Sequence, residues 1–81
     1  MIVKVLLFAA ARDAIGTGAL ELQLDDSACV GDLRQTLVEQ HPALVSLMSR
    51  CNVSVDREYS KDDRALYHGA EVGLIPPVSG G

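Results

Sequence analysis

The sequence predicts a small α+β domain in which helices cover one face of a β-sheet. Residues 19–24 alternate apolar and polar side chains, which is typical of a strand with one buried face. Residues 29–40 instead repeat apolar residues at helical spacing. The chain has 81 residues, of which 48% are hydrophobic and 22% charged. It can therefore bury one modest core but can hardly enclose a deep substrate pocket as well.

Residues 2–9 are apolar and rich in β-branched side chains, and we expect them to form the first strand. Lys4 sets the phase of this strand, because its ammonium group must reach water. Leu6 and Phe8 then share the outer face of the sheet, while the remaining side chains point into the core: Val3, Val5 and Leu7. Two large apolar residues on an outer face are unusual for a monomer. The alternative is that a second helix buries both.

Residues 10–15 are expected to form a short helical turn that stops at the glycines of residues 16–18. The strand at 19–24 follows closely, so we expect it to pair with the first strand as a hairpin. Its inward side chains are Leu20, Leu22 and Leu24. Residues 29–40 form the main helix, whose buried stripe consists of Val30, Leu33, Leu37 and Val38.

Pro42 cannot continue the main helix but suits the first turn of a second, shorter helix. That helix would bury Leu44, Leu47 and Met48. Residues 51–55 alternate again and predict a third strand that buries Cys51, Val53 and Val55. The polar stretch 56–63 is expected to be turn-like. Residues 71–75 form the last strand, with Val72 and Leu74 inward and Ile75 outward.

The net charge of the chain indicates which class of partner it can bind. Seven basic and eleven acidic residues give a formal net charge of −4. An acidic surface argues against binding nucleic acid or anionic membranes and favours basic patches on a protein partner. We see neither a signal peptide nor the roughly 20 apolar residues of a membrane span, so we expect a cytoplasmic protein.

Side chains that commonly carry chemistry are sparse. Cys29 and Cys51 fit no CxxC pattern and are expected to be reduced thiols. His41 and His68 have no Cys, Asp or His partners at ligand spacing, so we expect no metal site. The residues therefore do not favour a self-sufficient enzyme.

The last six residues, Pro76-Pro77-Val78-Ser79-Gly80-Gly81, follow the final strand directly. The two prolines stiffen the chain into an extended conformation, and the two glycines leave only backbone before a carboxylate. At roughly 3.3 Å per residue, such a tail reaches about 20 Å from the domain. We expect it to enter the active site of another protein, and a frayed terminus is the alternative.

The element order and the free Gly-Gly end resemble the ubiquitin-like sulfur carriers. Within that group, three features resemble the small-subunit family of molybdopterin synthase: the PPVSGG ending, the first strand running into Phe8-Ala9 and then Arg12, and the HGAEV turn before the last strand. The resemblance spans residues 1–81 and implies a β-grasp fold, with a mixed sheet packed on one main helix plus a short second helix. It divides the chain into a domain at 1–75 and an extended tail at 76–81.

The resemblance implies a carrier subunit whose catalytic side chains lie in a partner. An ATP-dependent, ubiquitin-activating-type adenylyltransferase and sulfurtransferase would turn the Gly81 carboxylate into a transient AMP adduct and then a thiocarboxylate. Gly80 and Gly81 would insert into the large subunit, in a heterotetramer of two small and two large subunits. Sulfur would pass to cyclic pyranopterin monophosphate in molybdenum cofactor biosynthesis. No stably bound cofactor is implied.

The resemblance also implies that the large subunit docks on the outer sheet face. Phe8 and Ile75 match apolar family positions there, Tyr59 is expected close by, and the strand phase adds Leu6. The tail residues expected to contact partners are Pro76, Pro77, Val78 and Ser79. Three other interpretations stay open: a sulfur carrier for thiamine synthesis or tRNA thiolation, a ubiquitin-like protein modifier, and an independent enzyme.

One departure from the family concerns the main helix. Cys29 stands where the family often has a threonine as the helix cap. A thiol is a poor cap, so we expect a loss of around 1 kcal/mol in stability at this helix end.

Overall fold

One mixed sheet organises residues 1–77, which are the residues described in the computed structural model. Within them, five strands run in the order β2-β1-β5-β3-β4. The strands are β1 (Ile2–Leu7), β2 (Ala19–Gln23), β3 (Asn52–Val55), β4 (Glu58–Ser60) and β5 (Glu71–Ile75). The helices are α1 (Ala9–Ile15), α2 (Val30–Gln40) and α3 (Val45–Met48), with a 3-10 turn, η1 (Pro42–Leu44), before α3. The predicted α+β class is confirmed.

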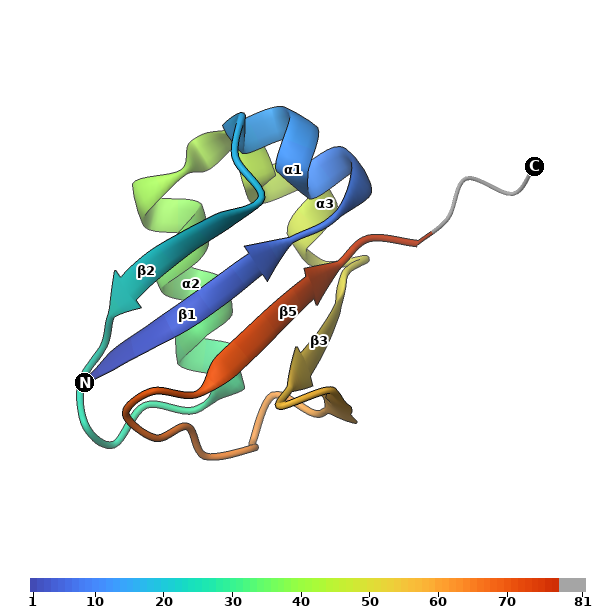
Figure 1. Ribbon diagram of the computed structural model, residues 1–81. Coiled ribbons are helices and arrows are strands. Elements are labelled where there is room, and N and C mark those ends of the chain that lie inside the picture. The colour runs from blue at the N-terminus through green and yellow to red at the C-terminus, as the bar shows by residue number, and fades with distance from the viewer. Residues whose placement is uncertain (78–81) are drawn as a thin grey trace.

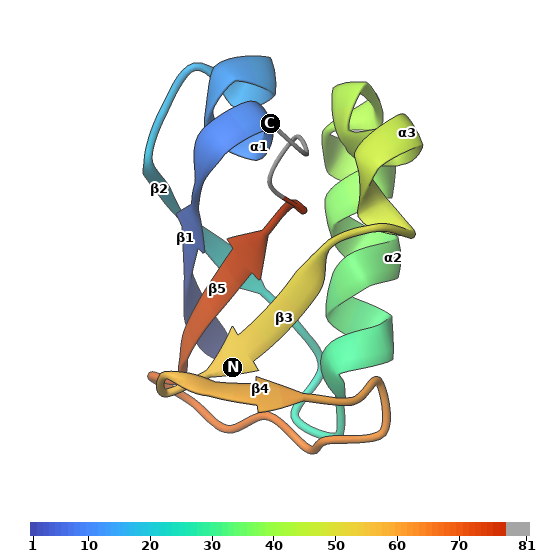
Figure 2. The same ribbon diagram turned by 90° about the vertical axis from the view of Figure 1, so that its right-hand side faces the viewer.

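The helices and the sheet form two layers. Figure 2 shows the sheet on one side of the molecule and both α2 and α3 on the other. α1 lies at the end of the sheet where β1 and β5 finish (Figure 1). Among the described residues, no helix covers the opposite face of the sheet, which we call the outer face.

The centre of the sheet is the parallel pair β1 and β5, in register from Lys4 opposite Glu71 to Leu7 opposite Leu74. β1 also pairs antiparallel with β2, which confirms the predicted hairpin, with α1 inserted in its connection. On the other side, β5 pairs antiparallel with β3, and β3 with β4. The two central strands therefore come from opposite ends of the sequence.

The core lies between the inner sheet face and α2. The inward phase predicted for β1 is confirmed, because Val3, Val5 and Leu7 are buried. The helical stripe of Val30, Leu33 and Leu37 is buried against them, with Val38 at its margin. Full burial of each such side chain contributes about 1.5–3 kcal/mol. This packing, rather than helix propensity, holds the two layers together.

The Asp32 side chain forms hydrogen bonds at the N-terminus of α2. Its carboxylate accepts a hydrogen bond from the Cys29 backbone N–H at 2.9 Å and another from the Cys29 thiol at 3.3 Å. The side chain at the third helical position therefore satisfies the cap residue, as in a capping box. The stability loss expected from the thiol at the cap position stays a prediction, and the Cys29 N–H is satisfied by Asp32.

Arg34 ties the helical layer to the sheet. Its guanidinium donates to the carbonyl oxygens of Met48 at 2.7 Å and Cys51 at 2.9 Å, and to the Asp62 carboxylate at 2.8 Å. The end of α3 is thereby held at the entry to β3. Burial raises the pKa of the Cys51 thiol, although Arg34 and Arg50 oppose the rise. Cys51 is therefore a packing residue, protonated at neutral pH.

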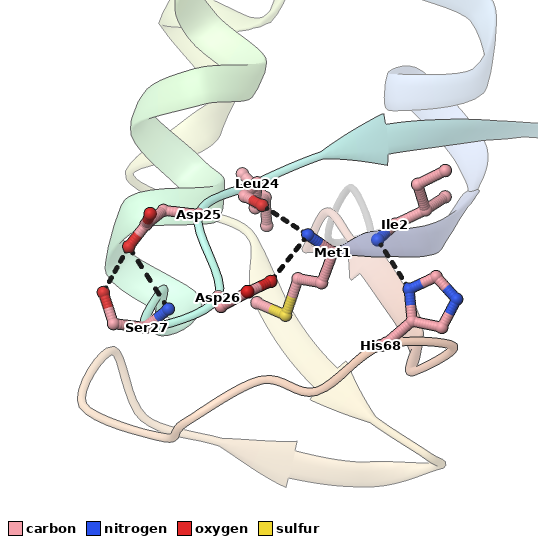
Figure 3. A network of polar contacts seen from close by, with 7 residues as sticks. All are labelled: Met1, Ile2, Leu24, Asp25, Asp26, Ser27 and His68. Atoms are coloured by element: carbon pink, nitrogen blue, oxygen red, sulfur yellow. Dashed lines mark hydrogen bonds and ion pairs between the residues drawn. The ribbon is translucent and has the colours of Figure 1, made fainter.

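Polar contacts fasten the start of β1 (Figure 3). The Met1 ammonium group donates to the Leu24 carbonyl at 2.8 Å and to the Asp26 carboxylate at 3.0 Å. The Ile2 N–H donates to Nδ1 of His68 at 3.0 Å. His68 is thus a hydrogen-bond acceptor in the loop before β5, which links the two central strands at their beginnings.

The structure corrects two element boundaries. The first strand ends at Leu7 rather than at residue 9, because Phe8 precedes α1 and Ala9 has a positive φ of 48°. The polar stretch 56–63 contains the short edge strand β4, which was expected to be a turn. Asp56 and Arg57, with φ of 50° and 72°, form the two-residue left-handed turn that folds β4 back onto β3.

Asp32 predicts a pH dependence of stability. Its hydrogen bonds from Cys29 lower the pKa of the carboxyl from 3.8. A folded-state pKa below the unfolded value stabilises the fold above about pH 4, and this contribution is lost as the pH falls through the folded pKa. Asp32→Asn should therefore reduce the free energy of unfolding at neutral pH and flatten its fall on acidification, measured by urea titration at several pH values. The exposed Asp63→Asn is the control, and parallel curves for Asp32→Asn and wild type would contradict the role.

Candidate functional site

The outer face gathers the apolar side chains that the strand phase predicted. Leu6 and Phe8 come from β1 and its end, Ile75 from β5 and Tyr59 from β4, and together they line one depression. Phe8 is 45% exposed and Tyr59 is 73% exposed, whereas Leu6 and Ile75 are half-buried. The alternative that a second helix buries Leu6 and Phe8 is wrong, because α2 and α3 lie on the inner face (Figure 2). We call these four residues the apolar patch.

Gly73 forms the floor of this depression. A Cβ atom at Gly73 would lie 2.5 Å from the Ser54 Oγ, which is closer than atoms can approach, and 3.5 Å from the Phe8 ring. Ser54 stands opposite both Gly73 and Tyr59 in the sheet register. Because Gly73 has no side chain, Ser54 and Phe8 can pack over β5. A hollow of about 430 Å³ remains open above them. A partner's side chains can enter this hollow.

The other half of the outer face is charged. Lys4 on β1 stands directly opposite Glu21 on β2 and Glu71 on β5. Arg57 and Glu71 also line the depression beside the apolar patch. The outer face thus has an apolar half toward the ends of β1 and β5 and a polar half toward their beginnings, as in an interface with an apolar centre and a charged rim.

The tail leaves the sheet beside the apolar patch. Pro76 is buried and Pro77 is exposed, and the partner contacts predicted for both residues stay predictions. Val78, Ser79, Gly80 and Gly81 lie outside the described residues, so their predicted roles stay predictions.

Sequence reasoning missed several residues of this site. Ser54, Arg57 and Glu71 line the depression but were not singled out. The family resemblance predicted Tyr59 as a docking residue, but β4, the strand that positions Tyr59, was not predicted. The turn before β4 lacks the Asn-Gly or Asp-Gly pair that normally marks such hairpins. The Asp56 carboxylate supports it by accepting from the Glu71 N–H at 3.1 Å.

Residues 1–77 contain neither a metal-binding cluster nor a membrane-spanning helix. In that part of the chain, no three His, Cys, Asp or Glu side chains gather in a way that could hold a metal ion. No helix there is long and apolar enough to cross a membrane.

The arrangement matches known proteins along its whole length. The ThiS family matches residues 5–81. The molybdopterin synthase sulfur carrier subunit of Chlamydomonas reinhardtii is 41% identical over 83 residues, covering 100% of both chains. Small archaeal modifier protein 1 of Haloferax volcanii is 36% identical over 83 residues, covering 93% of this chain and 95% of that protein. The crystal structure of SAMP1 from Haloferax volcanii superposes with a TM-score of 0.90 at 31% identity, covering 100% of both chains.

A further solved structure shows the same fold at low sequence identity. It is the complex of subunits 1 and 2 of molybdopterin-converting factor from Helicobacter pylori, which superposes with a TM-score of 0.73 at 23% identity, covering 100% of both chains. The mixed sheet, with α2 across one face, is the ubiquitin-like β-grasp fold. In this molecule an exposed apolar patch lies beside the last strand. The chain belongs to the ThiS family.

The close approach at Gly73 predicts a coupling between two positions. Gly73→Ala forces the Ser54 hydroxyl out of its place and should lower the free energy of unfolding by about 1 kcal/mol. In a Ser54→Ala background the same change should cost nothing, because the clashing oxygen is gone. Urea unfolding of the two single variants and the double variant measures the coupling. Equal effects of Gly73→Ala in both backgrounds would contradict the contact.

Proposed function

We propose that this chain is the sulfur-carrier subunit of a molybdopterin synthase and that its last residue, rather than a pocket, carries the chemistry. The observation behind the proposal is the end-to-end similarity to the Chlamydomonas reinhardtii subunit of that name. The exposed apolar patch beside the strand that leads into the Gly-Gly sequence supports it. A carrier needs a surface for docking and a terminus that partner enzymes can reach.

In the proposed reaction, the Gly81 carboxylate attacks the α-phosphorus of ATP, which releases pyrophosphate and leaves an acyl adenylate. A sulfide-level sulfur then attacks the acyl carbon, and AMP leaves with one carboxyl oxygen. The product is a thiocarboxylate, a soft nucleophile whose sulfur attacks a carbon of cyclic pyranopterin monophosphate as a carbon–oxygen bond at that carbon breaks and the oxygen leaves. Water cleaves the acyl carbon–sulfur bond and restores the carboxylate. Two glycines at the end suit this role, because enzymes must close around bare backbone.

The proposal assigns two kinds of partner. An ATP-dependent activating enzyme adenylates Gly81, and a large subunit supplies the pterin site, in a heterotetramer of two small and two large subunits. No cofactor stays bound to the carrier, and AMP is attached only transiently. The large subunit docks on the apolar patch, and the tail beyond Pro76 enters its active site. The two free cysteines suit the reducing cytoplasm, where we place the protein.

A protein modifier is the second candidate function. Its support is the 36% identity to small archaeal modifier protein 1. Both functions begin with activation of the terminal carboxylate. They differ in the nucleophile that takes the acyl group, which is a sulfur in the carrier and a lysine amine of another protein in the modifier.

Mass spectrometry of the intact chain tests both functions. Incubation with the activating enzyme, ATP and sulfide should raise the mass by the difference between one sulfur and one oxygen. The chain without Gly81 is the control, and it should fold as wild type but show no exchange. Lysine conjugates of high molecular weight, without the exchange, would favour the modifier. Exchange in the control would contradict the role of Gly81.

Phe8 tests the docking surface. Phe8→Asp places a carboxylate in an interface with an apolar centre, so the dissociation constant for the large subunit should rise at least tenfold. Tyr67→Asp is the matched control, because Tyr67 is 49% exposed and lies in the loop before β5 rather than on the apolar patch. Isothermal titration calorimetry gives both constants. An unchanged affinity for Phe8→Asp would show that docking uses another face.

A further inference from the structure

The base of the tail is built into the fold at the common end of the two central strands. β1 and β5 run parallel and finish side by side (Figure 1). The Phe8 N–H makes the last link between them, to the Leu74 carbonyl at 3.4 Å. Beyond that link, Phe8, Ala9, Ile75 and Pro76 line an apolar cleft of about 280 Å³. The two segments therefore meet through side chains just where backbone pairing stops.

The two adjacent prolines occupy different environments. Pro76 is buried in contact with this cleft, whereas Pro77 is exposed. Proline has no N–H and a fixed φ, so Pro76 ends the pairing of β5 with β3, whose last register pair is Asn52 with Ile75. Ile75 and Pro76 each precede a proline and are thereby held in extended conformations. The chain direction through Pro76 is thus restricted by backbone sterics and by packing.

The opposite wall of the cleft contains a strained residue. Ala9 has a φ of 48°, a left-handed conformation that a non-glycine residue adopts only when its surroundings impose it. Phe8 before it is extended, with φ of −121° and ψ of 153°. This abrupt change from strand to helix places Ala9 in the lining of the cleft that Pro76 also lines, and it leaves the Phe8 ring over Gly73 on the outer face. The turn at Phe8 and Ala9 therefore contributes residues to both the apolar patch and the cleft.

We propose that Pro76, seated against Phe8 and Ala9, is a positioning residue for the reactive terminus, an inference that rests on the proposed sulfur-carrier function. The sheet fixes the point and the direction from which the following residues start. Fewer directions of departure raise the effective concentration of the terminus at the partner's site once the domain has docked. Pro76 therefore acts on the transfer step, while the apolar patch governs docking.

Three substitutions separate these effects. Pro76→Ala frees φ and should slow sulfur transfer from the thiocarboxylated chain at least fivefold in single turnovers with saturating large subunit. Its dissociation constant should stay within twofold of wild type. Pro77→Ala should slow transfer less, because that ring lies outside the cleft. Pro42→Ala makes the same chemical change at the start of η1 and controls for the loss of a proline elsewhere.

A second variant keeps the test decisive if Pro76→Ala unfolds. Ala9→Gly suits the positive φ, so it should fold at least as stably as wild type, yet it removes the methyl group beside Pro76. It should slow transfer two- to threefold at unchanged affinity. Wild-type transfer rates in Pro76→Ala or Ala9→Gly, or equal slowing by Pro76→Ala and Pro77→Ala, would overturn the positioning role. Failure of wild-type thiocarboxylate to transfer sulfur would instead contradict the proposed function.

Discussion

The parallel pairing of β1 with β5 is the constraint on which the rest of the structure depends. Parallel neighbours cannot be joined by a tight turn, so the chain between them must cross the sheet, and α2 in that crossover covers one face. The shared register also ends both strands at the same edge. Phe8 and Ile75 meet there although 67 positions in the sequence separate them. The apolar patch and the tail base are both consequences of this pairing.

The inner half of the fold could be predicted because burial imposes a period. The inward-facing side chains of β1 are Val3, Val5 and Leu7, and they alternate with side chains that reach water. Because Lys4 must reach water, it shows which side chains face outward. The same phase argument placed Leu6 and Phe8 on the outer face before any contact was known. Burial of the α2 stripe followed from its helical spacing. A repeating pattern is informative because many residues must satisfy it together.

The remaining features depend on single residues in unusual conformations or on long-range contacts. β4 exists because Asp56 and Arg57 accept a left-handed turn, and Tyr59 joins the apolar patch only through that strand. Pro76 and Pro77 are identical in local chemistry, yet only the first reaches the cleft beside Ala9. Whether Pro76 is buried depends on where the end of β1 lies. Neither the composition nor the residue spacing of the tail predicts that position.

An exposed apolar patch carries a risk of self-association, and the charge distribution reduces it. The formal net charge is −4, so two copies repel each other over the distance at which patches would meet. The apolar patch has a charged rim, which includes Lys4, Glu21 and Glu71. A partner that buries the apolar half must also offer groups complementary to these charges. The outer face therefore combines an apolar centre with a charged rim, and the net negative charge of the whole chain opposes its association with a second copy.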